Sequence, residues 1–170
     1  MKPQHLFLGS AVAAMVILAG CKAQQTNNMM EKEKMTGPDH ILVMAKDVDW
    51  KDAPAALPAG AKIAVLEEDP SKPGPFTLRL QFPADYKIAP HFHPADEHVT
   101  VISGTFARAM GDTFDSTKLE ELGAGGFAMM KTGASHFAWS KDGGVVQLHG
   151  IGPWGLTYVN PADDPRNAAK

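Results

Sequence analysis

The residues best suited to chemistry lie between positions 91 and 104. His91 and His93 are separated by one residue, so on a β-strand their imidazoles project from the same face. Pro94 ends that strand, a short turn follows, and Glu97 opens a β-branched run that ends at Gly104. A hairpin of this kind can direct two imidazoles and one carboxylate at a single point. These ligand types together suit a divalent first-row transition metal.

A third imidazole comes from farther along the chain. His136 follows a short apolar strand and a glycine turn, and it opens another predicted strand that ends at Ser140. Three imidazoles and one carboxylate leave one or two positions open on a five- or six-coordinate metal. Open positions are typical of catalytic rather than structural metal sites. The alternative is a hydrogen-bonded polar cluster that holds no metal.

The spacing of these residues resembles the two motifs of the cupin superfamily. The first motif, H-x-H-x3-E-x6-G, and the glycine and histidine positions of the second, G-x7-G-x2-H, both occur. The matching residues are His91, His93, Glu97, Gly104, Gly125, Gly133 and His136. Asp85, Lys131 and Ser140 depart from the usual residues of the motifs, but none of them stands at a ligand position.

The resemblance implies a jelly-roll β-barrel and one metal ion, which is Fe, Mn, Ni, Cu or Zn in cupins. The implied ligands are His91, His93, Glu97 and His136. Cupins with this ligand set include enzymes that cleave β-diketones or flavonols with O2, enzymes of oxalate chemistry and sugar isomerases. The resemblance alone suggests a homodimer, because cupins often pair through strands.

Composition agrees with a single all-β domain. The chain has 170 residues, 44% of them hydrophobic, with 16 Gly and 13 Pro, which favour many turns. We expect nine or ten short strands between residues 39 and 160, including a first strand at 41–44 and an alternating strand at 76–82, followed by a tail at 161–170. The net charge is −3 and no basic stripe occurs, so nucleic acid is not expected as a partner.

The N-terminus has the layout of a bacterial lipoprotein signal peptide. Lys2 precedes an apolar run that ends in Leu18-Ala-Gly-Cys21, which resembles a lipobox. This predicts cleavage after residue 20, a lipid on Cys21, a tether over residues 21–38, and a domain held by the lipid at a membrane of the cell envelope. The alternative is an ordinary signal peptide with a chance cysteine.

Several other residues are candidates for a substrate pocket. Strand parity sends Glu97 and His98 to opposite faces, so His98 is not expected to be a ligand. Gln147 and His149 share one face of a later strand, and they would contact a substrate or support the metal ligands only if that face is internal. The sequence does not determine whether that face is internal or external. Apolar residues near the motifs could also shape the pocket: Phe127, Met129, Phe137 and Trp139.

Three functions are compatible with these residues. The leading hypothesis is a metal-dependent enzyme, of dioxygenase type, that acts on a small organic molecule. The alternatives are a non-catalytic cupin that binds a metabolite or senses a metal, and a barrel whose metal is purely structural. No catalytic acid, base or nucleophile outside the ligand set is assigned by the sequence.

Overall fold

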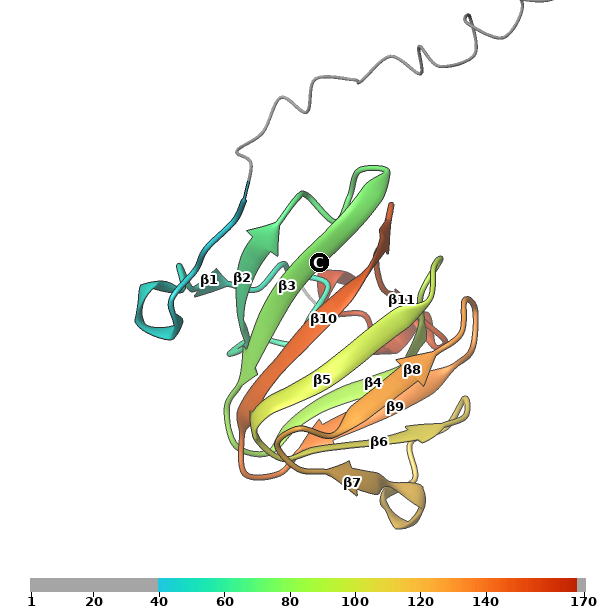
Figure 1. Ribbon diagram of the computed structural model, residues 1–170. Coiled ribbons are helices and arrows are strands. Elements are labelled where there is room, and N and C mark those ends of the chain that lie inside the picture. Colours follow the sequence, from blue (N-terminus) through green and yellow to red (C-terminus); the bar gives the residue numbers. More distant parts are fainter. Residues whose placement is uncertain (1–39, 168–170) are drawn as a thin grey trace, which may run out of the picture. The chain divides into compact units, whose positions relative to one another are not determined.

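The computed structural model describes residues 40–167 and consists of two antiparallel sheets that face each other (Figure 1). The six-stranded sheet has the order β1-β2-β3-β10-β5-β8, and the five-stranded sheet has the order β11-β4-β9-β6-β7. The strands of the first sheet are β1 (Lys51–Asp52), β2 (Lys62–Glu67), β3 (Gly74–Phe82), β10 (Gly144–Gly152), β5 (Glu97–Gly104) and β8 (Phe127–Met130). Those of the second are β11 (Thr157–Tyr158), β4 (Tyr86–Phe92), β9 (His136–Ser140), β6 (Phe106–Met110) and β7 (Glu120–Leu122).

The remaining elements are four short 3-10 helices. They are η1 (Ala45–Asp47), η2 (Ser116–Lys118), η3 (Pro161–Asp163) and η4 (Pro165–Asn167). No helix within residues 40–167 is long and apolar enough to cross a membrane. The all-β architecture expected from the sequence is therefore confirmed for the described part of the chain.

Alternation along the strands places one face of each sheet in a shared core. On β3, the side chains of Phe76, Leu78, Leu80 and Phe82 are buried, as their spacing predicts. On β5, Val99 and Val101 are buried in the same way, and Glu97 is buried with them. Glu97 therefore enters the interior because it occupies an apolar position of the strand pattern.

The strand expected at 41–44 is not formed. Ile41, Leu42, Val43 and Met44 lie in irregular backbone and are 53%, 78%, 37% and 55% exposed. Among the described residues no strand lies beside this run, and the main chain turns into η1 through a hydrogen bond from the Asp47 amide to the Met44 carbonyl, 2.9 Å long. Apolar composition predicted a strand here, but a strand also requires a partner for its hydrogen bonds.

The predicted signal peptide, Cys21 and tether lie outside the described residues.

The structure describes the predicted tail as far as residue 167, and in this part Arg166 is bonded to residues close to it in the chain. Its guanidinium pairs with the Asp164 carboxylate at 2.6 and 2.8 Å and donates to the Leu156 carbonyl at 3.4 Å. These contacts fix η4 against the segment that leads into β11.

Candidate metal centre

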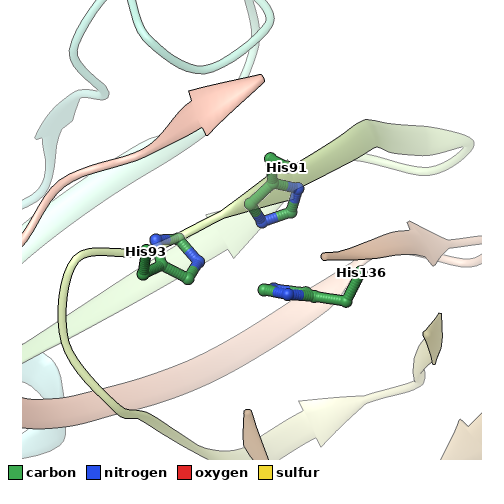
Figure 2. A group of neighbouring side chains, drawn as sticks. All are labelled: His91, His93 and His136. Atoms are coloured by element: carbon green, nitrogen blue, oxygen red, sulfur yellow. The ribbon is translucent and has the colours of Figure 1, made fainter. Parts of the chain in front are cut away.

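Three imidazoles meet in the space between the two sheets. His91 lies near the end of β4, His93 lies just beyond it, and His136 opens β9, which pairs with β4 so that His91 and His136 are register partners (Figure 2). One ring nitrogen from each lies within 4.8 Å of the others, and all three side chains are buried. The pairing of β4 with β9 thus brings the two sequence motifs together.

The Glu97 carboxylate stands beside this cluster. Its Oε2 is 3.5 Å from His93 Nε2 and 3.4 Å from His136 Nε2. Burial by itself raises the pKa of the Glu97 carboxyl, but its interactions with His136 and His93 outweigh burial, and the pKa falls below its usual range. Glu97 is therefore an anion at neutral pH, and its carboxylate lies close enough to the cluster to be a candidate fourth ligand.

The main chain orients each imidazole. Nδ1 of His91, His93 and His136 lies 2.8, 2.6 and 3.0 Å from the carbonyl oxygens of Ala89, Gly155 and Ala134, respectively. A carbonyl oxygen can only accept, so each Nδ1 carries a proton, which leaves Nε2 of each ring as the nitrogen that can bind an ion. Burial, together with the neighbouring His136 and His93, lowers the pKa of His91 to about 3, so His91 is neutral at physiological pH. Imidazoles whose orientation is fixed by main-chain carbonyls are suited to bind a metal.

One unpaired nitrogen in the cluster is consistent with a metal site. His93 Nε2 is buried and has no hydrogen-bond partner. A buried polar atom left unpaired costs about 1–3 kcal/mol, so such atoms require an explanation. Three inward Nε2 atoms and one carboxylate fit a divalent first-row metal by their chemistry and their convergence.

Two residues of the segment after β10 hold His93 in place. The indole of Trp154 stacks on the His93 imidazole, with ring centroids 4.4 Å apart and planes 19° apart, and the next residue supplies the Gly155 carbonyl. The Trp154 amide donates to the Pro70 carbonyl at 2.7 Å, which ties this segment to the loop between β2 and β3. We name residues 152–155 the strap. Sequence reasoning missed it, because no motif marks Trp154 or Gly155 as neighbours of His93.

A cavity of about 370 Å³ reaches the candidate ligands. His91, His93 and Glu97 contribute to its wall, and most of the remaining wall is apolar. The apolar residues include Leu57, Ile63, Leu78, Leu80, Ile88, Leu148 and Leu156. Its polar residues, Asp69, Ser71 and Arg166, are engaged with each other or with Asp164. The cavity therefore suits a small and largely apolar organic molecule.

Other predicted pocket residues lie elsewhere. Gln147 and His149 are on the outer face of β10, since Val146 and Leu148 take the inner face, so neither can contact a substrate in this cavity. Phe127 and Met129 are 55% and 39% exposed on β8 and point outward for the same reason. Phe137 and Trp139 are also absent from the cavity wall. His98 points outward, as its parity predicts, and is not a ligand of this centre.

Comparison with known proteins agrees with this geometry. The model of the ChrR cupin-like domain matches residues 38–154. No curated protein matches the chain.

Three solved structures share the fold. The polyketide cyclase RemF from Streptomyces resistomycificus is 16% identical with a TM-score of 0.62, over 74% of this chain and 89% of that one. A candidate acetylacetone dioxygenase from Methylibium petroleiphilum PM1 is 23% identical with a TM-score of 0.57, over 76% and 88%. An RmlC-like cupin from Shewanella frigidimarina is 16% identical with a TM-score of 0.51, over 67% and 91%. The fold, the buried histidines and the matched domain model together show that the chain belongs to the ChrR cupin-like domain family of the cupin superfamily.

Proposed function

We propose that this protein is a metal-dependent oxidoreductase, of dioxygenase type, that acts on a small and largely apolar organic molecule. The observation that carries the proposal is a buried cluster of three imidazoles beside an ionised carboxylate, of which His91, His93 and Glu97 lie on the wall of a cavity of about 370 Å³. A closed structural site has no need of such a cavity, whereas a catalytic site requires both open coordination positions and room for a substrate.

The residues around the centre have different roles: some would bind the metal, some orient the metal ligands, and some bind the substrate. A bound metal supplies a Lewis acid with open positions for an oxygen atom of the substrate or for O2. His91, His93, Glu97 and His136 hold that ion, and their backbone carbonyl partners keep the imidazoles from turning. The apolar wall binds the carbon skeleton and excludes bulk water, which strengthens the electrostatic interactions inside the cavity.

A second function, non-catalytic capture of a metabolite, is favoured by one specific observation. Apart from the ligands and the Trp154 indole, whose Nε1 has no hydrogen-bond partner, the polar side chains on the cavity wall are engaged: Asp69 accepts two hydrogen bonds from Ser71, and Arg166 is paired with Asp164. No carboxylate or amine on the wall is thus free to move a proton. Turnover distinguishes this function from the first, because both require the same metal and the same cavity.

We expect the purified protein to contain close to one equivalent of a first-row metal and to consume O2 when given a suitable substrate. Residues 22–170 would be reconstituted with Fe(II), Mn(II), Ni(II), Cu(II) or Zn(II) and supplied with β-diketones, starting with acetylacetone. Elemental analysis and an oxygen electrode supply the two measurements.

The His91→Ala/His93→Ala variant should lose both the metal and oxygen uptake, whereas His40→Gln, at an exposed position, should lose neither. Metal without oxygen uptake across a broad substrate panel would favour capture of a metabolite. Failure of all five ions to bind would refute both functions.

We propose further that Cys21 carries a lipid and holds the domain at a membrane of the cell envelope. The proposal is supported by the Leu18-Ala-Gly-Cys21 sequence behind an apolar run, with Cys21 as the one cysteine of the chain. Cells fed radiolabelled palmitate should label the wild-type protein, and Cys21→Ser should abolish the label and move the protein to the soluble fraction. A Cys21→Ser variant that stays with the membranes would refute the anchor.

A further inference from the structure

Two histidines face each other on the outer surface of the six-stranded sheet. His98 on β5 and His149 on β10 are register partners, and their rings lie parallel, with centroids 4.9 Å apart and planes 17° apart. The residues that flank them, Glu97, Val99 and Leu148, point inward. The pair therefore lies on the opposite side of the sheet from the candidate metal centre.

The pair belongs to a polar row that crosses four strands. Glu67 on β2 is the register partner of Thr77 on β3, and Thr77 is the register partner of His149. The Thr77 hydroxyl donates to the Glu67 carboxylate at 2.9 Å, which holds that carboxylate in the row. A groove of about 730 Å³ contains both imidazoles and Glu67 among its lining residues. Two imidazoles and two carboxylates, those of Glu67 and Asp96, thus share the groove, and the Asp96 carboxylate is already bonded to Lys131 and Thr132.

The His98 imidazole has an unsatisfied nitrogen. His98 Nδ1 is buried without a hydrogen-bond partner, as is His93 Nε2 in the inner centre. The sheet has thus oriented the His98 ring without supplying a partner for that nitrogen. Two imidazoles side by side, one of them with an unpaired nitrogen, offer ring nitrogens to a shared ion.

We propose that His98 and His149 form a second, outer metal site that takes a divalent transition metal such as Cu(II), Ni(II) or Zn(II). Imidazole ligands favour these ions over Mg(II) or Ca(II), which prefer oxygen ligands. Metal–nitrogen bonds of about 2.0–2.1 Å require the two ligating atoms to approach to about 3 Å, so binding would require the exposed His149 ring to turn toward His98. Glu67 is the carboxylate available as a third ligand, and water completes the coordination.

The stoichiometry of metal binding tests this proposal independently of any activity. The whole protein would be dialysed against micromolar Ni(II), Zn(II) or Cu(II) and its metal content measured. We expect two equivalents in the wild type and one in the His98→Gln/His149→Gln variant. His91→Ala/His93→Ala should retain the outer equivalent, and its Cu(II) electron paramagnetic resonance spectrum should show coupling to two nitrogens. His40→Gln is the matched control and should bind two equivalents.

Each remaining outcome contradicts the outer site. A wild-type protein that binds a single equivalent would overturn it, and so would a second equivalent that survives His98→Gln/His149→Gln or that appears only at millimolar metal. Because the exposed His149 contributes little to the core, His149→Gln alone should fold as the wild type does and lower the affinity of the second equivalent at least tenfold. An unchanged affinity in that single variant would also overturn the proposal.

Discussion

Glu97→Gln is expected to lower the affinity of the inner centre for its metal by about 100-fold or more. The substitution preserves the volume of a buried side chain and removes its negative charge and one ligand oxygen. Loss of groups that merely support metal ligands costs about 10–100-fold, so loss of a ligand should cost at least the upper end of that range. A hundredfold loss corresponds to about 2.7 kcal/mol. Competition with a chromophoric chelator measures the affinity directly.

The same substitution at an exposed glutamate supplies the control. Glu120 lies on β7 with an exposed side chain, 3.8 Å from Arg108, and Glu120→Gln should leave the metal affinity unchanged. Thermal unfolding with and without the metal gives a second measurement, because the stabilisation by metal should shrink in Glu97→Gln alone. Wild-type affinity in Glu97→Gln would show that the centre consists of three histidines and that Glu97 lies outside the coordination sphere.

Gly152→Ala is expected to destabilise the domain by about 3 kcal/mol and to weaken metal binding at the same time. A Cβ atom at Gly152 would lie 2.1 Å from the Lys72 carbonyl oxygen and 2.7 Å from that of Pro70, so the main chain must move. The strap would shift with it, and Trp154 and Gly155 would lose their contacts with His93. Urea unfolding measures the stability, and chelator competition measures the metal affinity.

Gly155→Ala is the matched control for the strap. A Cβ atom there meets nothing within 4 Å, and the carbonyl that accepts from His93 is kept. We expect Gly155→Ala to be neutral or to stabilise the domain slightly through the unfolded chain. If Gly152→Ala lowered stability without affecting the metal, the strap would support the fold but not the orientation of His93. Equal effects of the two variants would refute the steric argument.

The fold and the four candidate ligands were predictable because both depend on local alternation. The spacing of His91 and His93 fixed their common face, and the apolar parity of Val99 and Val101 carried Glu97 inward. Alternation did not identify the buried face of β10, because the adjacent residues Val145 and Val146 place an apolar side chain on each face. The sequence therefore left the orientation of His149 open, and the pairing of β10 with β3 and β5 settles it.

Features that depend on tertiary contact could not be predicted. The strap is held beside His93 by two hydrogen bonds, one from the Trp154 amide to the Pro70 carbonyl and one between His93 and the Gly155 carbonyl. In each bond the two partners are far apart in the sequence, so no local pattern predicts it. The run at 41–44 shows the reverse, since its composition suits a strand but no partner strand lies beside it among the described residues. Local composition describes what a segment can form, and packing decides what it does form.

The pairing of β4 with β9 has a consequence for the supply of metal in the cell. His91 and His136 become neighbours only when these two strands pair, so the unfolded chain contains no such cluster. A metal bound by this cluster would therefore be taken up when the barrel folds, from the ions free at that place, because the ranking of affinities among first-row metals is largely independent of what the protein does with them. Two compartments with different free metals would load the same sequence differently. The identity of a metal at this centre would thus depend on the compartment in which the barrel folds.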